Sequence, residues 1–428
     1  MYNGLSLEQA PPISVVLRFF LTVPFFGLLL TCCIFIYPAE VLTPLHPYSL
    51  AAVHLMFLGV MSMSMIGALF QMQSVLGGRA IPSPSGNALI IHTFLTVGIL
   101  ALAGAFIFAV PVLFTLASVL LGAAIVYTAN LVLPLLFGGL VHDTLRGMRL
   151  SLIALTLTAV LGIIMASSYA SSSFGFHHAM IRTSHYSLGL IGWIGALIIA
   201  VAFQVIEMFY VTTPYSTWCK RNTFRILGAA LALKIAFVFL GWQYGWVFDL
   251  TIAALLIGFA VTTLKKLRER KRRVSDVSIR FWTFGTVLLI LSTASHAAFL
   301  FIGIAALETL ALLAFALFSL AVILGMMGKI VPFLVWFHLS SAGYMEVPIM
   351  SNIIPAARAK ILFWLFSLTA AAVLFGPFVP EAFAAGALFG AVMFAVLLYN
   401  LIKALGLYRH TLANGTRFIM EESPPSAL

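Results

Sequence analysis

Charged residues are scarce in this sequence. Of its 428 residues, 8% are charged and 62% are hydrophobic, whereas an ordinary soluble domain carries about 25% charged residues. A soluble fold cannot keep so much apolar surface away from water, so this class of protein is excluded. The composition instead predicts an all-α polytopic membrane protein, because a helix satisfies its own backbone hydrogen bonds inside a lipid bilayer.

Cysteine is almost absent, and so are the short motifs of soluble enzymes. Cys32, Cys33 and Cys219 form an odd set without the spacing of a zinc site, which argues against a disulfide framework. The chain has no Walker loop, dinucleotide-binding glycine motif, nucleophile elbow or HExxH. Hydrolase or kinase chemistry of the soluble type therefore has no support.

Long apolar runs, in contrast, fill most of the chain. Crossing a hydrocarbon core of about 30 Å takes roughly 20 helical residues, and this length divides the sequence into about twelve spans. They form a single transmembrane domain over residues 1–428, with Pro, Gly and Ser at most junctions. The predicted spans are Val15–Tyr37, Tyr48–Leu76, Ala88–Val110, Val112–Phe137, Leu150–Tyr169, Tyr186–Val211, Ile226–Trp242, Trp246–Thr263, Phe281–Ile302, Thr309–Phe337, Ile361–Phe375 and Ala382–Leu407.

The basic residues between these spans predict the orientation. The formal net charge is +11, but Lys and Arg lie between apolar segments and form no solvated face, so nucleic acid is not a predicted partner. Connections after even-numbered spans carry most of them, including the run Lys265–Arg273, whereas those after odd-numbered spans carry only Arg182. The positive-inside rule then places both termini in the cytoplasm, and we expect a bacterial inner membrane. We interpret the basic run as a topology anchor touching anionic lipid headgroups.

A weak internal repeat relates the second, sixth and tenth spans. The second reads HLMFLGVMSMSMIGALFQMQSVL, the sixth reads SHYSLGLIGWIGALIIAVAFQVIEMF, and the tenth contains GMMGKIVPFL. Four spans separate each from the next, which predicts three four-helix arcs, residues 15–137, 150–263 and 281–407, around a pseudo-threefold axis. These three spans should face inward. The alternative is that Gly-rich apolar helices resemble one another by chance.

Histidines at membrane depth are the first candidate site residues, because ionisable groups there are costly. His54 follows His46 by eight residues and so lies about 12 Å further along the second span from the outer face. An imidazole at this depth can hold a metal or haem iron through one nitrogen while a backbone carbonyl or a polar side chain fixes the other. His296 in the ninth span matches it in depth, so the two are the predicted cofactor ligands. The alternative is that each histidine only bonds a neighbouring Ser or carbonyl.

Other histidines lie near the outer face. His177 and His178 are adjacent in the connection before the sixth span, and His185 stands at the mouth of that span. Imidazoles so grouped can chelate copper, and methionines at helical spacing in the second span are also soft copper ligands. Metal-free loop histidines and methionines used for packing are the alternatives.

On the inner side, Glu207 and Gln204 share one face of the sixth span, and Lys329 lies in the equivalent stretch of the tenth. A Glu207–Lys329 pair would neutralise both charges in the low dielectric, as a structural element or as one station of a proton path. Lys234 in the seventh span either extends to the interface or meets Asp249.

Together these features resemble a known family. About twelve helices in three arcs, an inside N-terminus and a His followed by a Leu-Gly pair are similar to the catalytic subunit of the haem-copper oxidase superfamily. The likeness is closer to its shorter haem-binding relatives of the NnrS type, which are associated with haem, copper and nitric-oxide stress. The residues and motifs that carry it are His54, Leu58, Gly59, Gly67 and Gln71, SHAAF around His296 and GMMGKIVPFL around Lys329. The resemblance implies a haem b with His54 as a low-spin ligand and His296 as its partner.

The sequence also departs from the oxidase pattern. The sixth span has QVIEMF where the oxidases have His-Pro-Glu-Val, and GWQYGW replaces their His-His pair after the seventh helix. The stretch Thr309–Lys329 has none of the histidines that the oxidases place in their tenth helix. Oxygen reduction at the usual binuclear centre is therefore not expected.

The leading hypothesis is a haem-copper-oxidase-like integral membrane protein that binds haem b. It would act in electron transfer, or in the handling of nitric oxide or oxygen or protection against them, with a membrane or periplasmic redox partner. One alternative is a transporter for copper, haem or another small solute, lined by inward-facing Met and Gln with Glu207 and Lys329. Another is a non-catalytic respiratory assembly factor. The sequence does not decide whether the protein is an enzyme.

Overall fold

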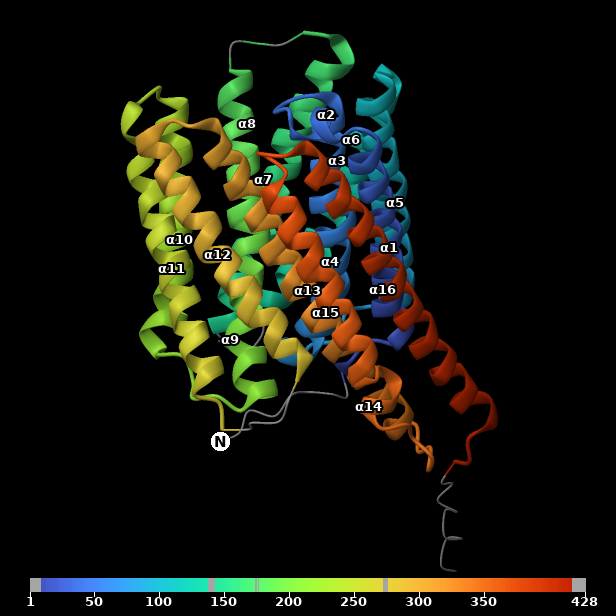
Figure 1. The fold of residues 1–428 in the computed structure, drawn as a ribbon. Helices are drawn as coiled ribbons and strands as arrows, with labels where there is room; N and C mark the ends of the chain where they lie inside the picture. Colours follow the sequence, from blue (N-terminus) through green and yellow to red (C-terminus); the bar gives the residue numbers. More distant parts are fainter. Residues whose placement is uncertain (1–8, 138–142, 174, 176, 272–275, 418–428) are drawn as a thin grey trace, which may run out of the picture.

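The computed structural model describes residues 9–137, 143–173, 175, 177–271 and 276–417. Long helices run side by side along one common direction (Figure 1). The elements are α1 (Ile13–Ile36), α2 (Pro38–Leu42), α3 (Pro47–His54), the π-helical segment η2 (Leu55–Ser62), α4 (Met63–Gly77), α5 (Pro84–Phe108), α6 (Pro111–Phe137), α7 (Asp143–Ser171), α8 (His178–Tyr186), the π-helical segment η3 (Ser187–Gly195), α9 (Ala196–Tyr210), α10 (Thr217–Phe239), the short η4 (Gln243–Gly245), α11 (Trp246–Arg268), α12 (Val277–Ile302), α13 (Ala305–Ser341), α14 (Met350–Ile353), α15 (Ala356–Phe375) and α16 (Pro380–Asn414).

The predicted all-α membrane class is confirmed. The structure has 12 helical stretches that are long and apolar enough to cross a bilayer. Two of them are composite: Pro47–Gly77 joins α3, η2 and α4, and His178–Tyr210 joins α8, η3 and α9. The described residues form no strand, only an isolated backbone bridge between Tyr344 and Arg417.

The local sequence explains where several helices begin and end. Proline occupies the first position of α3, α5, α6 and α16, where its missing N–H is not needed. The side chain of Asp276 caps α12 by accepting the N–H of Ser278 at 2.9 Å. Gly78 and Gly303 end α4 and α12 with φ of 64° and 73°, a left-handed conformation that glycine adopts without strain.

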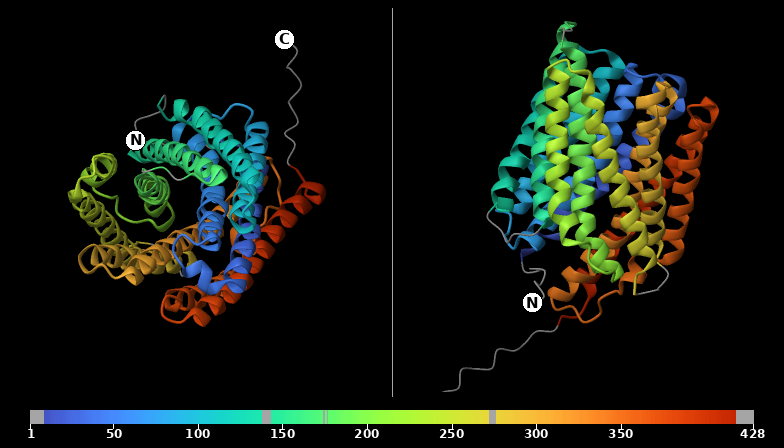
Figure 2. Two further views of the ribbon diagram at one scale, coloured as in Figure 1. Left: turned by 90° about the horizontal axis from the view of Figure 1, so that it is seen from above. Right: turned by 90° about the vertical axis from the view of Figure 1, so that its left-hand side faces the viewer.

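The second, sixth and tenth spans form the centre of the bundle. In their most apolar stretches, 72%, 72% and 78% of the residues are buried, against 50% or less in every other span. This burial agrees with the predicted inward position of the three related spans. Helices adjacent in sequence pack as neighbours, for example α12 along α13, α5 along α6 and α15 along α16 (Figure 2). The division into three arcs stays a prediction.

Glycines allow α1 to approach the second span closely. A Cβ atom at Gly59 would lie 2.6 Å from the Phe26 ring, and one at Gly67 would lie 2.6 Å from the Cβ of Phe19. Both phenylalanines belong to α1 and are fully buried. The helix backbones can therefore come together only because these positions lack a side chain.

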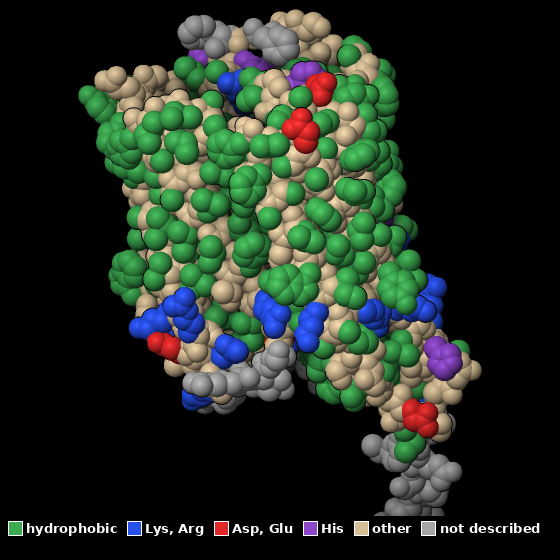
Figure 3. Space-filling view, in the orientation of Figure 1, with side chains coloured by type: hydrophobic (Ala, Val, Ile, Leu, Met, Phe, Trp, Pro, Cys, Tyr) green, Lys and Arg blue, Asp and Glu red, His purple; other side chains and the backbone are tan. Residues whose placement is uncertain are grey.

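The two ends of the bundle differ in charge. On the face drawn in Figure 3, most Lys and Arg side chains form a band near one end, and hydrophobic side chains cover the region between the ends. We call this the basic end; its residues include Arg149, Lys220, Arg221, Lys265, Lys266, Arg280, Arg358 and Lys360. The opposite end, which carries α2 and α8, is called the cavity end. Arg272 and Arg273, the last residues of the predicted basic run, lie outside the described residues.

Candidate functional site

A cavity of about 730 Å³ lies among the helices in the half of the bundle nearer the cavity end. Most of its lining is apolar, with a few polar side chains, which is typical of cofactor and ligand sites. Its titratable lining includes His54, His185, His296, Arg182, Lys234, Asp249 and Glu308. The cavity thus brings together four histidines from three different membrane spans, because His178, on the same span as His185, also lines it.

His54 is the last residue of α3, directly before η2. Its Nδ1 lies 2.7 Å from the carbonyl oxygen of Leu50. Because a carbonyl only accepts hydrogen bonds, Nδ1 must donate its proton, and Nε2 keeps a lone pair. The ring stacks on Phe106 with centroids 5.5 Å apart. The orientation of the imidazole is therefore fixed by a backbone bond and a ring contact.

His185 is held in the same way. It lies in α8, and its Nδ1 is 2.9 Å from the carbonyl oxygen of Thr158 in α7. Its ring centroid is 6.3 Å from that of His54, with 39° between the ring planes. The structure therefore brings His185 next to His54, and each ring has its Nδ1 hydrogen bonded to a backbone carbonyl.

A π-helical segment follows each of these histidines: His54 directly precedes η2, and His185 lies two residues before η3. Such segments are rare and occur frequently at functional sites. Here they are joined, because Trp193 of η3 donates from Nε1 to the Ser62 hydroxyl of η2 at 2.9 Å. Ser62 in turn donates to the carbonyl of Phe57 at 2.7 Å. This link fixes the position of one histidine-bearing span relative to the other.

His296 lies on another wall of the cavity, beside a buried ion pair. Lys234 Nζ of α10 is 2.5 Å from Asp249 Oδ1 of α11. The contact between these two residues, one of the two alternatives predicted for Lys234, is therefore confirmed. His296 Nε2 of α12 lies 3.7 Å from the same oxygen. His296, the predicted partner of His54, thus lies beside Asp249 instead. The ring beside His54 is that of His185, which the sequence analysis proposed only as a copper ligand. The internal repeat already hinted that His185 and His54 are related, because aligning the second and sixth spans places His185 close to the position of His54.

The structure does not gather the outer histidines into one three-ligand group, and copper binding by them stays a prediction. His177 is exposed and its Nδ1 lies 3.5 Å from Met180 Sδ, while the ring of His178 lies 6.0 Å from that of Tyr169. Within the part of the chain that the structure describes, no three His, Cys, Asp or Glu side chains form a group that could hold a metal ion. His177, His178 and His185 are therefore not a three-ligand set.

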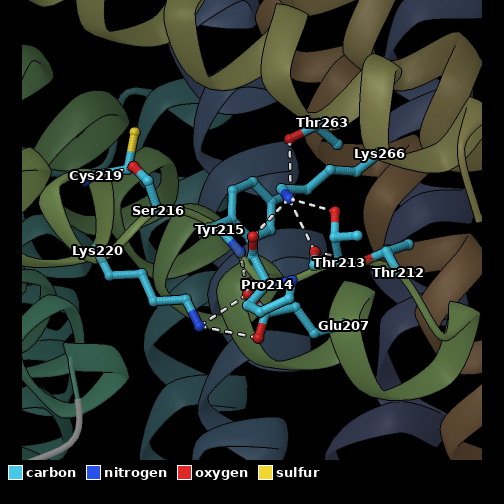
Figure 4. A network of polar contacts seen from close by, with 10 residues as sticks. All are labelled: Glu207, Thr212, Thr213, Pro214, Tyr215, Ser216, Cys219, Lys220, Thr263 and Lys266. Atoms are coloured by element: carbon cyan, nitrogen blue, oxygen red, sulfur yellow. Dashed lines mark hydrogen bonds and ion pairs between the residues drawn. The ribbon is translucent and has the colours of Figure 1, made fainter.

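The predicted Glu207–Lys329 pair is wrong. The Glu207 carboxylate lies 2.8 Å from Lys220 Nζ and accepts the backbone N–H of Tyr215 at 2.6 Å (Figure 4). Lys329 pairs instead with Asp276. The cause is the connection from α9 to α10, which folds back over the end of α9 and brings Lys220 to Glu207. Gln204 is partly buried on the same helix and is not among the residues of this network.

The rest of this network attaches the α9–α10 connection to α11. Lys266 Nζ donates to the carbonyls of Thr213 and Pro214, both at 2.8 Å, and lies 4.9 Å from the centre of the Tyr215 ring. The Tyr215 hydroxyl is 2.9 Å from Thr263 Oγ1. Burial raises the pKa of Tyr215 above its usual range, so the hydroxyl stays protonated. These contacts hold the α9–α10 connection against α11, so we interpret the network as structural.

Comparison with known protein families finds no match, and no curated protein matches the sequence either.

Proposed function

We propose that this protein is a haem-copper-oxidase-like integral membrane protein that binds haem b in the cavity through His54 and His185. The observation that carries the proposal is the pair of imidazoles 6.3 Å apart on the cavity wall, each with Nδ1 bound to a backbone carbonyl. This second bond is the usual arrangement of a metal-binding histidine, because it fixes the tautomer and makes Nε2 more basic.

The donor set fits haem better than a bare metal ion. A bare zinc ion is held by three or more protein ligands, and the described residues hold no group of three His, Cys, Asp or Glu side chains that could bind a metal ion. A porphyrin brings four nitrogens of its own, so two histidines complete the coordination of its iron. Metal–imidazole bonds are about 2 Å long, and two rings with centroids 6.3 Å apart can therefore share one ion.

Two histidine ligands, His54 and His185, favour electron transfer among the roles that the sequence left open. Bound haem would supply one-electron redox chemistry, with a potential set by its ligands and by the hydrogen bonds to them. If both His54 and His185 held the iron, no coordination position would remain for a gas molecule. Electron transfer therefore fits this site better than direct binding of nitric oxide or oxygen, and a redox partner would approach the cavity end.

A pigment spectrum tests the proposal. Protein purified from haem-replete cells is expected to show a Soret band and the spectrum of a low-spin bis-histidine haem. His54→Ala and His185→Ala should each abolish that low-spin spectrum. His296→Ala and the control His46→Ala, which changes a helix cap outside the pair, should keep it. A colourless wild-type protein that takes up no haem in titration rejects the proposal. Loss of the spectrum in His296→Ala but not in His185→Ala would instead support His54 and His296, the pair predicted from the sequence.

Transport of copper is the second candidate, and a second cavity favours it. This smaller cavity, about 80 Å³, is lined by side chains of α1, α4, α7, α9, α12 and α13 but by no charged group. Its methionines are Met65, Met72, Met148, Met326 and Met327. Thioethers are soft ligands that select Cu(I). A colourless protein whose vesicles accumulate copper would support transport over haem binding.

A further inference from the structure

Arg182 is an exception to the charge distribution of this protein. It is the only Lys or Arg in the connections that follow odd-numbered predicted spans. A basic residue at the cavity end opposes the bias that sets the orientation of the chain.

The position of Arg182 connects it to the histidine pair. It lies in α8, three residues before His185, and lines the same cavity. Residues three apart share one face of a helix. Arg182 therefore stands about 4.5 Å nearer the cavity end than His185, on the same side of α8.

Among the described residues, no acidic side chain forms an ion pair with Arg182. The charged residues of the lining are Arg182, Lys234, Asp249 and Glu308. Lys234 and Asp249 neutralise each other at 2.5 Å, and none of the ion pairs within 4.0 Å among the described residues includes Arg182. Glu308, the remaining acid, is thus not in contact with it. A guanidinium in such a place is suited to a carboxylate, which it binds with two parallel hydrogen bonds.

We infer that Arg182 binds a carboxylate group of the molecule held in the cavity. On the proposed function, on which this inference rests, that group is a propionate of haem b. The carboxylate would then lie beside Arg182, nearer the cavity end than His185, which would hold the iron. Arg182 is thus a positioning residue that selects a ligand with acidic substituents and sets its direction in the cavity.

Haem b and its dimethyl ester together provide the test, because the ester has the same porphyrin and iron but no carboxylate. Arg182→Met keeps the length of the side chain and removes the charge. It should weaken haem b binding about tenfold or more, the effect of a lost charged hydrogen bond, and leave ester binding as in the wild type. Arg182→Lys should recover part of the loss. Arg221→Met at the exposed basic end is the matched control and should change neither.

The outcomes separate this inference from the proposed function. If the wild type binds neither porphyrin, the haem proposal fails. If the wild type binds haem b and Arg182→Met binds it equally well, only the role of Arg182 is refuted. Equal weakening for haem b and its ester also refutes it, since the arginine would then support the cavity and not a carboxylate. An unchanged Soret position in Arg182→Met shows that the two histidines still hold the iron.

Discussion

At the residue scale, the ionisable groups inside this bundle are held by specific partners. Lys234 and Asp249, with side chains 10% and 12% exposed, form a neutral pair at the cavity wall. Removing one partner of such a pair leaves a charge in a low dielectric, whereas removing both leaves none. The free energy of unfolding should therefore depend strongly on whether one or both are changed.

We expect Lys234→Met and Asp249→Asn each to lower the free energy of unfolding by about 3–5 kcal/mol. The double variant should lose less than either single variant, because no charge remains buried. Unfolding in detergent, followed for all three, measures this. The exposed Lys265–Glu269 pair, at 4.0 Å with side chains 72% and 53% exposed, is the control, and breaking it should change stability by less than about 1 kcal/mol. Additive losses in the double variant would contradict the neutral-pair interpretation.

The depth of a residue in the membrane could be predicted from the sequence, but its neighbours on other helices and connections could not. The cost of an imidazole at membrane depth singled out His54 and His296 as cofactor ligands; both line the cavity, and their role as ligands stays a prediction. Depth does not say which helices are neighbours, so the ring beside His54, that of His185, was not recognised as its partner. Glu207 was assigned to Lys329 because the repeat aligned them, but the sequence does not encode how the connection after α9 folds back. The ion pair with Lys220 therefore could not be predicted.

At the scale of single elements, the number and type of the helices followed from hydropathy, and their ends did not. The helix α13 spans Ala305–Ser341, longer than the predicted Thr309–Phe337, and α7 begins at Asp143 rather than Leu150. Polar turns at a helix end, Asp143–Arg146 in α7 and His338–Ser341 in α13, continue the helix beyond the apolar run, and hydropathy does not detect them. The π-helical segments η2 and η3 were also missed, since an apolar run carries no signal that separates π from α.

Close packing of α1 on α4 gives a second prediction. Gly67→Ala should lower the free energy of unfolding by about 1–3 kcal/mol, because the new methyl group would overlap Phe19. Gly258 in α11 has no atom within 4 Å of the corresponding position. Gly258→Ala should therefore leave stability unchanged or raise it by up to about 1 kcal/mol, as alanine is the better helix former. Thermal unfolding of both variants tests this, and equal effects at the two sites would contradict the packing argument.

The N-terminus of α12 gives a pH-dependent prediction. Burial acts to raise the pKa of Asp276, but hydrogen bonds from Lys329 and Ser278 outweigh it and hold the pKa below its usual value. A depressed pKa stabilises the fold fully above the unfolded value of about 3.9, and this contribution is lost as the pH falls through the lower folded value. Asp276→Asn keeps a capping oxygen and removes the charge that pairs with Lys329.

The variant should consequently be less stable than the wild type at pH 7. The difference should shrink as the pH falls below about 4, because the unfolded chain then takes up a proton that the folded carboxylate, with its lower pKa, still resists. Melting temperatures of both proteins between pH 7 and pH 3 measure it. A difference that stays constant over this range would show that the charge of Asp276 does not stabilise the fold.

At the scale of the whole molecule, composition and the Lys/Arg bias carried most of the prediction. They gave the 12 spans and the separation of a basic end from a cavity end. Helix α1 begins and α16 ends at the basic end (Figure 1). Composition and charge bias could not predict the cavity, because its shape depends on how side chains from many spans pack together. The cavity and its histidine pair emerge only from the assembled bundle.

The orientation in the membrane is the prediction that belongs to this scale. Anionic lipids and the membrane potential retain Lys and Arg on the cytoplasmic side, so the basic end should face the cytoplasm and the cavity end the periplasm. A fluorescent protein fused after Leu428 is expected to fluoresce, and alkaline phosphatase at the same position to be inactive. Phosphatase inserted after Ser173, in the exposed connection between α7 and α8, should be active. The opposite pattern would place the histidine pair on the cytoplasmic side, and a redox partner would then have to be sought there.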